Sequence, residues 1–224
     1  MIRWTQLAAA TVPDDGGELR LMQRGEEYSI MSGSIELMNS RVSGSEEALA
    51  NLVSARLGDA PAPDVLIGGY GMGFTLRAAL ASLGAKARVT VAELTPEVIA
   101  WARGPMARLT AGCLDDPRVR LVEGDVALLI GAAARAYDAI LLDVDNGPEG
   151  LSRAANDRLY DRAGLDAARR ALRPGGILAV WSSAPSATFS RRLRQAGFQV
   201  EEHRVRARRN GGGARHMIWL AAAA

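Results

Sequence analysis

Glycines and acidic residues follow four successive apolar runs in the middle of the chain. The segment Gly69-Tyr70-Gly71-Met72-Gly73 comes after DVLI, Glu93 after VTVA, Asp125 after VRLVEG, and Asp143 after YDAILL. In an open parallel sheet, ligands bind in the crevice outside the carboxyl ends of the strands. One glycine turn and three carboxylates at neighbouring strand ends therefore indicate a nucleoside-like ligand and an enzyme that uses it.

The glycine turn has the spacing GxGxG, formed by Gly69, Gly71 and Gly73. Glycines let a backbone approach a ligand where a side chain would clash, and the helix that follows offers free N–H groups. Phe74 stands where a dinucleotide fingerprint has its third glycine, which argues against NAD. The alternative is a turn that only packs a strand on a helix.

Glu93 lies twenty residues beyond Gly73, at the end of the second predicted strand. A carboxylate at this place can accept both hydroxyl protons of a ribose. The alternative is a surface glutamate that caps a helix. In combination with the glycine turn, we favour the ribose interpretation.

Gly124 and Asp125 end the third predicted strand. The carboxylate could accept a hydrogen bond from an adenine amino group while the adjacent backbone reads the ring. Asp125 could equally cap the helix that follows, and the two roles are compatible. A third acid is unnecessary for binding a dinucleotide, so it favours another adenosine cofactor.

Asp143 begins the run DVDNGP and bears most directly on the type of reaction. A carboxylate here could orient an amine and take its proton during attack, which is the work of a general base. The same residue types are common in turns, which is the alternative. Asp145 and Asn146 in this run, and Tyr160 beyond it, are secondary candidates; Tyr160 either covers the site or packs.

Composition narrows the class of protein. A chain of 224 residues with 48% hydrophobic residues can bury the core of one main domain. The net charge is +2, but the basic residues are interspersed with acids, so we expect no nucleic-acid face. One cysteine, Cys113, and two histidines, His203 and His216, argue against a disulfide or a metal site. We expect both histidines to be packed or solvated, and Trp101, Trp181 and Trp219 to lie in the core.

No signal-peptide core is evident, and no apolar stretch approaches the eighteen or so residues that a membrane span needs. We therefore expect a soluble cytoplasmic protein without a membrane partner.

Residues 1–60 are expected to form a β-rich N-terminal extension followed by a first helix. ELRLMQR, EEYSIMS and SIELMNS alternate like strands and are separated by Arg24-Gly25 and Ser32-Gly33, which predicts an antiparallel meander. GSEEALANLVSARL has helical periodicity, with Ser45 as the expected N-cap and Glu46 and Glu47 in the first turn.

Residues 61–224 alternate between strands and helices. Strands are expected at VLIG, VTVAEL, VRLVEG, AILLDV and GILAVWS, and helices at TLRAALASLG, PEVIAWARGPMARL, DVALLIGAAARA, LYDRAGLDAARRAL and ATFSRRLRQAG. Thr95 is the expected cap of the second of these helices. This alternation predicts an α/β fold, a parallel sheet with helices on both faces. QVEEHRVRAR and ARHMIWLA, joined by a glycine loop, predict a closing antiparallel strand pair.

From about Glu18 to Pro174, the motifs resemble those of the spermidine synthase (polyamine aminopropyltransferase) family, a branch of the AdoMet-dependent methyltransferase superfamily. VLIGGYGMGFTLR is similar to that family's VLVIGGGDGGTLRE, DDPRVRLVEGDV to its DPRVKVIIGDA, and YDAILLDVDNGPEG to its YDVIIVDSTDPVGPAE. The resemblance implies a class I methyltransferase-like (Rossmann-like) fold. It also implies that Glu93 holds the ribose, Asp125 the adenine amino group and Asp143 the attacking nitrogen.

The chain departs from this family where the substrate would lie. Met72 replaces an Asp that holds the amino group of the donor, and Ser45-Glu46-Glu47 replaces Tyr-Gln-Glu. The second Asp of DSTDP aligns with Asn146 or is lost. A diamine such as putrescine is a dication, and its burial requires acidic partners. These losses therefore argue against a polyamine acceptor, although Glu46 or Asp145 could substitute.

The sequence therefore predicts a transferase that uses S-adenosylmethionine, or decarboxylated S-adenosylmethionine, to alkylate a small nucleophile, with an amine favoured. Methyl transfer is slightly favoured over aminopropyl transfer because the polyamine contacts are altered. The alternatives are a true polyamine aminopropyltransferase, a non-catalytic nucleoside-binding protein and an NAD-dependent oxidoreductase. The expected partner is a small-molecule substrate, and only the family resemblance suggests a homodimer.

Overall fold

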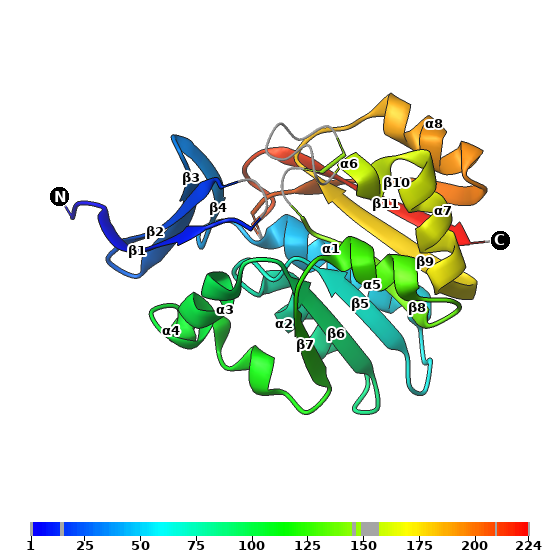
Figure 1. Cartoon of the computed structure of the whole chain (residues 1–224), viewed down its shortest axis with the longest axis horizontal. Helices are drawn as coiled ribbons and strands as arrows, with labels where there is room; N and C mark the ends of the chain where they lie inside the picture. Colours follow the sequence, from blue (N-terminus) through cyan, green and yellow to red (C-terminus); the bar gives the residue numbers. More distant parts are fainter. Residues whose placement is uncertain (1, 14–15, 145–146, 149–156, 209, 224) are drawn as a thin grey trace.

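The structure is a computed structural model that describes residues 2–13, 16–144, 147–148, 157–208 and 210–223. These residues form two β-sheets, a small antiparallel sheet near the N-terminus and a large mixed sheet flanked by helices. The small sheet lies beyond one end of the large sheet (Figure 1). The predicted α/β fold class is confirmed.

The small sheet has the order β1-β2-β3-β4. Its strands are β1 (Thr5–Thr11), β2 (Glu18–Arg24), β3 (Glu27–Ser32) and β4 (Ile35–Asn39). The meander formed by β2, β3 and β4 confirms the prediction from alternating residues. Strand β1 was not predicted, because TQLAAAT alternates only weakly in residue size; its pairing with β2 has a register shift between Gln6 and Ala8.

The large sheet has the order β10-β11-β9-β8-β5-β6-β7. Its strands are β5 (Asp64–Gly68), β6 (Arg88–Glu93), β7 (Val119–Glu123), β8 (Tyr137–Leu142), β9 (Leu172–Ser182), β10 (Phe198–Arg206) and β11 (Arg215–Ala223). Strands β7, β6, β5, β8 and β9 are parallel, and β10 and β11 form the predicted antiparallel pair. The chain runs outward from β5 to β7 and returns to pair β8 with β5. The topological switch, where such sheets bind ligands, therefore lies between β5 and β8.

Helices cover both faces of this sheet. They are α1 (Gly44–Leu57), α2 (Phe74–Ser82), α3 (Pro96–Arg103), α4 (Ala107–Thr110), η1 (Cys113–Asp115), α5 (Val126–Ala132), α6 (Asp157–Tyr160), α7 (Arg162–Ala171) and α8 (Ala187–Gln195). Successive side chains of a strand point to opposite faces. Val65 and Ile67 of β5 accordingly pack with α1, α2 and α3, and Leu66 packs with α5, α7 and α8. Figure 1 shows α5, α7 and α8 on one side of the sheet and α1 and α2 on the other.

Several local predictions differ from the structure. The helix expected at LYDRAGLDAARRAL is divided at Asp161, which caps α7, into α6 and α7. The helix expected over 96–109 stops at Arg103 and resumes at Ala107, because Pro105 cannot supply the N–H that a continuous helix needs. Helix α1 begins at Gly44 with Ser43 as its N-cap, so Ser45 lies inside the first turn. Thr95 occupies the N-cap of α3, but its side chain makes no capping hydrogen bond.

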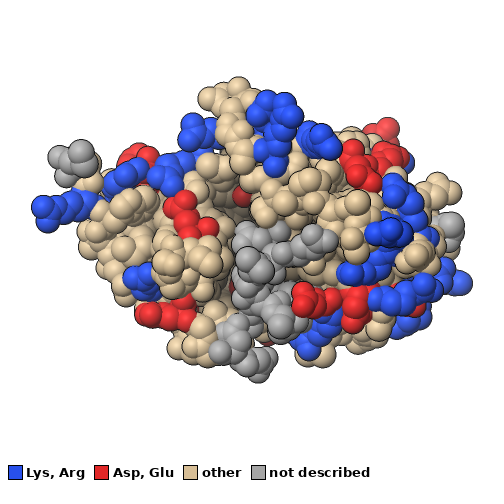
Figure 2. Space-filling model, turned by 90° about the horizontal axis from the view of Figure 1, so that it is seen from above, with Lys and Arg blue, Asp and Glu red and all other residues tan. Residues whose placement is uncertain are grey.

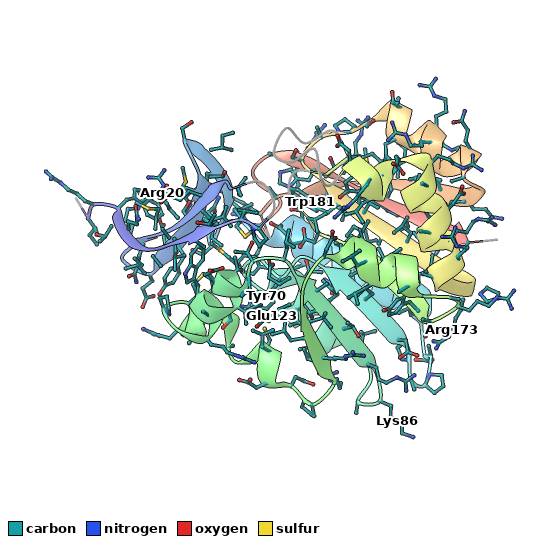
Figure 3. All side chains as sticks on the ribbon, in the orientation of Figure 1. Arg20, Tyr70, Lys86, Glu123, Arg173 and Trp181 are labelled. Carbon is teal, nitrogen blue, oxygen red and sulfur yellow. The ribbon has the colours of Figure 1, made fainter. Side chains whose placement is uncertain are left out.

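The three tryptophans expected in the core are buried: Trp101, Trp181 and Trp219. Basic and acidic side chains are both present on the face shown in Figure 2. Arg173 bonds to Asp64 at 2.7 Å and also contacts Asp138, at the amino ends of the parallel strands. Figure 3 places Arg173 and Lys86 at this end, opposite to Trp181.

None of the helices in the described part of the chain is long and apolar enough to cross a membrane. The same residues contain no cluster of three or more His, Cys, Asp or Glu side chains that could hold a metal ion.

The turn after β5 provides a test of the fold. A Cβ added at Gly69 would lie 2.3 Å from the carbonyl oxygen of Asp143, and the φ of +86° is strained for other residues. We expect Gly69→Ala to lower the free energy of unfolding by about 2 kcal/mol or more, measured by urea denaturation. The control is Gly84→Ala, because nothing lies within 4 Å of a Cβ there. Equal effects of the two substitutions would contradict this packing argument.

Candidate active site at the carboxyl ends of the strands

Main-chain hydrogen bonds join the ends of four neighbouring strands. The N–H of Asp143 donates to the Gly68 oxygen at 2.9 Å, that of Gly69 to Ala92 at 2.9 Å, and that of Gly124 to Glu93 at 2.8 Å. The segments that carry the predicted ligand contacts are thereby held side by side. Six of the predicted site residues line one pocket: Gly69, Gly71, Glu93, Gly124, Asp125 and Asp143.

The glycines of the turn are required by close packing. Gly69, Gly71 and Gly73 have φ angles of +86°, +54° and +74°. A Cβ at Gly71 would meet the Met38 sulfur at 2.8 Å, and one at Gly73 would meet the Tyr70 hydroxyl at 2.8 Å. Packing alone therefore explains these glycines. Because they have no side chains, the main chain of Gly69 and Gly71 is also directly accessible from the pocket.

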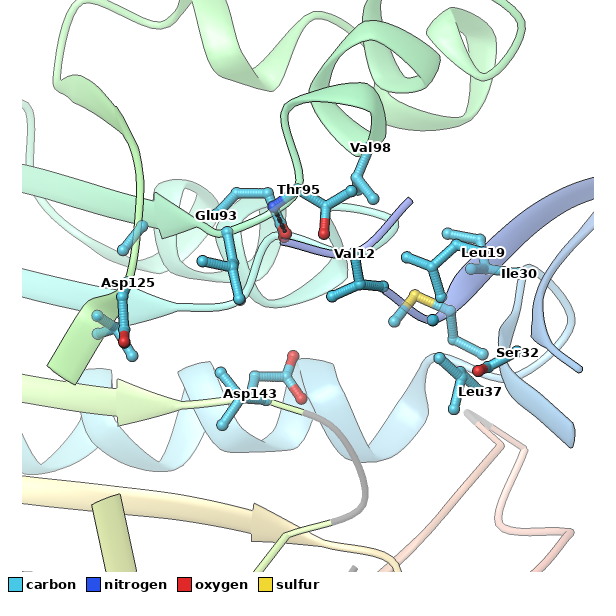
Figure 4. Close-up of a pocket in the computed structure, with 18 of the residues that line it drawn as sticks. Val12, Leu19, Ile30, Ser32, Leu37, Glu93, Thr95, Val98, Asp125 and Asp143 are labelled. Atoms are coloured by element: carbon cyan, nitrogen blue, oxygen red, sulfur yellow. Dashed lines mark hydrogen bonds between the residues drawn. The ribbon is translucent and has the colours of Figure 1, made fainter. Parts of the chain in front are cut away.

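Glu93 is held in place by two main-chain N–H groups. Its Oε2 accepts from Tyr70 at 3.0 Å and its Oε1 from Thr95 at 2.9 Å. The side chain is buried rather than on the surface, and burial raises its pKa while these hydrogen bonds oppose the rise. The carboxylate thus faces the pocket in a fixed orientation, as a partner for two hydroxyl groups requires (Figure 4).

Asp125 has partners for both oxygens. Its Oδ1 accepts from the N–H of Ala127 at 2.8 Å, so Asp125 caps α5, the alternative role that the sequence left open. Its Oδ2 pairs with the guanidinium of Arg158 on α6, a contact that the sequence analysis missed. Gly124 beside it has nothing within 4 Å of an added Cβ, so the pocket is open at this point.

Asp143 follows β8 and is partly buried. The hydroxyl of Thr75, in the first turn of α2, donates to its Oδ2 at 2.6 Å. Burial raises the pKa of Asp143 to about 6, against the lowering effect of this hydrogen bond. Glu46 on α1 lies close enough that the charge of Asp143, after burial itself, helps to raise the pKa of Glu46 to about 7. The two carboxyl groups therefore titrate as a coupled pair near neutral pH.

Ser45 and His216 extend this pair. The Ser45 hydroxyl lies 2.6 Å from Glu46 Oε2 and 2.8 Å from His216 Nδ1. The His216 ring also packs edge-on against Trp181, with centroids 4.9 Å apart. His216 is packed, one of the two states expected for it. Its contact with Ser45 had no signal in the sequence, because the two residues lie 171 positions apart.

The other predicted substrate residues lie elsewhere. Met72 and Tyr160 are both buried, Tyr160 edge-on to Phe189 at 5.6 Å, and neither is among the described residues that line the pocket. Glu47 lies on the first turn of α1 and acts on Glu46 through its charge. Asp145 and Asn146 are outside the described residues.

The side of the pocket away from the strand ends is apolar and belongs to the small sheet and its connections. We call these residues the roof: Val12, Leu19, Ile30, Leu37 and Met38. Figure 4 shows several of them facing Asp143 and Glu93 across the pocket. The roof was not predicted, because nothing in the sequence of residues 12–38 indicates that they reach the large sheet.

A known family model matches more than half of the chain. Residues 45–193 match the model of the spermine/spermidine synthase domain. The chain belongs to this family. The expected resemblance is thus confirmed by a match that spans α1 to α8.

Two curated relatives illustrate the family. The chain is 33% identical over 153 residues to polyamine aminopropyltransferase 1 of Streptomyces coelicolor, a match that covers 65% of this chain and 28% of the relative. It is 39% identical over 129 residues to putrescine N-methyltransferase 2 of Nicotiana attenuata, covering 57% of this chain and 33% of the relative. The chain thus spans only about a third of the length of these relatives.

Solved structures confirm the fold. The spermidine synthase from Thermotoga maritima superposes with a TM-score of 0.77 at 19% identity, over 98% of this chain and 73% of the other. A spermidine synthase in complex with the transition-state analogue AdoDATO gives a TM-score of 0.74 at 19% identity, over 98% and 72%.

Glu93 offers a direct test of the pocket. We expect Glu93→Gln to weaken binding of a 5′-thioether adenosine product at least about tenfold, because a charged hydrogen-bond acceptor contributes about 1.5–3 kcal/mol. The measurement is isothermal titration calorimetry. The matched control is Glu123→Gln, which alters an exposed carboxylate at the paired position of the adjacent strand. Unchanged affinity in Glu93→Gln would refute the ribose assignment.

Proposed function

We propose that the protein transfers an alkyl group from an AdoMet-type sulfonium to a small amine. The observation that carries this proposal is the single pocket that joins Glu93 to Asp143 across the switch point of the sheet. The names of the family relatives include both aminopropyl transfer and methyl transfer to an amine.

The residues present suit the adenosine part of such a donor. Glu93 accepts the ribose hydroxyl protons with the lone pairs that its two main-chain contacts leave over. The open space beside Gly124 accommodates the base, and Asp125 lies next to it to accept from an amino group. The bare main chain of Gly69 and Gly71 lets the ligand approach the strand ends. We propose residues 61–224 as the donor-binding domain, with residues 1–60 as an extension that supplies the roof.

Asp143 acts as the general base of the proposed reaction. The donor supplies a carbon–sulfur bond that breaks to leave a neutral thioether, while a carbon–nitrogen bond forms. Asp143 then receives the proton of the new ammonium group. With a pKa near 6, this carboxyl is mostly ionised at pH 7 and can accept the proton. The apolar roof excludes water from the same space.

Two groups can be transferred under this proposal. Methyl transfer is supported by the glycine turn, where the buried side chain of Met72 offers no carboxylate to the amino group of decarboxylated AdoMet. Aminopropyl transfer is supported by the names of the bacterial relatives and by Glu46, which adds a second carboxyl beside Asp143.

The transferred group can be measured directly. We incubate the protein separately with AdoMet and decarboxylated AdoMet in the presence of a pool of cellular amines, and identify the products by mass spectrometry. A product that carries one added methyl group supports the first form, and one added aminopropyl group supports the second. Binding without any product would favour a nucleoside-binding protein. If neither donor nor its thioether product stabilises the protein against heat, the proposal is wrong.

Asp143→Asn tests the base. We expect the rate to fall about 100-fold or more while binding of the thioether product is retained. The pKa of Asp143 is raised from 3.8 to about 6 in the folded protein. The protonated carboxyl therefore makes its full contribution to the free energy of unfolding below pH 4, and this contribution is lost as the pH rises through 6. Asn cannot ionise, so the variant should resist urea better than the wild type at about pH 8 and lose this advantage near pH 4.

The control for both measurements is Asp59→Asn, which alters an exposed aspartate in the segment before β5. Wild-type turnover in Asp143→Asn would remove this residue from the mechanism.

A further inference from the structure

Ser45 connects two ionisable side chains from opposite ends of the chain. Its hydroxyl oxygen lies 2.6 Å from Glu46 Oε2 on α1 and 2.8 Å from His216 Nδ1 on β11. Ser45 itself has no exposed surface, so water does not compete for these two contacts. A continuous hydrogen-bonded chain therefore runs from the carboxyl group to the imidazole.

The single proton of this hydroxyl allows two arrangements. When Glu46 is ionised, Ser45 donates to it, and His216 must donate to Ser45 from a protonated Nδ1. When Glu46 carries a proton, it donates to Ser45, and Ser45 donates to an unprotonated Nδ1. The switch between these arrangements moves one proton from Glu46 to His216 without any displacement of the side chains.

The surroundings of Glu46 place its ionisation, and with it this switch, near neutral pH. Glu46 faces two other acids, Asp143 and Glu47, and after burial the charge of Asp143 is the larger of their effects. Burial lowers the pKa of His216, which favours the neutral imidazole whose Nδ1 can accept a hydrogen bond from Ser45. On the neighbouring strands, His216 is paired with Val205 of β10, and its ring packs on Trp181 of β9.

We propose that Ser45 and His216 form a relay that removes the proton of Glu46 whenever Asp143 takes up a proton from the substrate. This inference rests on the proposed function. The proton of the new ammonium moves to Asp143, the Glu46 proton moves to Ser45, and the Ser45 proton moves to His216 Nδ1. The carboxyl pair thus keeps one negative charge throughout. His216 is a positioning residue, because it acts on Asp143 through Ser45 and Glu46.

The kinetic test uses the two histidines of the chain. We expect His216→Ala to lower kcat about tenfold, with KM changed less than about twofold, and added imidazole to restore part of the rate. Ser45→Ala should lower kcat similarly but gain nothing from imidazole, because the connection to Glu46 is lost. The control is His203→Ala, on the adjacent strand β10 and beside Glu201.

A second measurement needs no turnover. The chain has two histidines, so both can be followed by NMR titration of the folded protein. When Glu46 is ionised, His216 carries a proton on Nδ1, and when Glu46 is protonated this nitrogen is unprotonated. We expect the ¹⁵N signals of neutral His216 to report a move of its ring proton from Nε2 to Nδ1 as the pH rises through about 7, where Glu46 ionises, and Glu46→Gln to abolish this move. This readout also remains available if the His216→Ala variant does not fold.

The outcomes separate the relay from the proposed function. If the wild type turns over and His216→Ala matches it, the relay is wrong and the proposed function stands. If the wild type turns over neither donor, the proposed function is wrong, and the relay as a step in it falls too. If the ring nitrogens of His216 respond to pH in the same way in Glu46→Gln and in the wild type, the relay is wrong whatever the turnover.

Discussion

The site depends on the lateral main-chain hydrogen bonds that continue past the last paired residues of β8, β5, β6 and β7. They bring the turn after β5 so close to the start of the next loop that a side chain at Gly69 would overlap the Asp143 carbonyl. The positions of Glu93, Asp125 and Asp143 follow from that register. A shift of one residue in any strand would turn its acid to the opposite face of the sheet.

The same fold gives its acids different chemistry through their partners. Glu93 is buried but receives two N–H groups, which suits a fixed acceptor of hydrogen bonds. Asp125 combines a helix cap with an ion pair. Burial raises the pKa of Asp143 to about 6, and burial together with the charge of Asp143 raises that of Glu46 to about 7. Residues perturbed in this way are typical of the places where proton transfer occurs.

The local parts of this structure could be predicted from the sequence. The strand ends and the cap at Asp125 follow from runs of apolar residues and from the glycines and acids at the points where those runs stop. Pro105 also lies within the helix expected over 96–109, and a proline in a helix interior indicates the interruption that the structure shows. The roof and His216 could not be predicted, because their places depend on contacts between distant segments that leave no periodic pattern.

The roof has a consequence for how much family membership says about specificity. The family match covers residues 45–193, which include the acids at the strand ends. Val12, Leu19, Ile30, Leu37 and Met38, which form the opposite wall, all precede the matched segment. Substitutions in this N-terminal part can therefore reshape the pocket without touching the residues that define the family. Two members with the same strand-end acids need not accept the same amine.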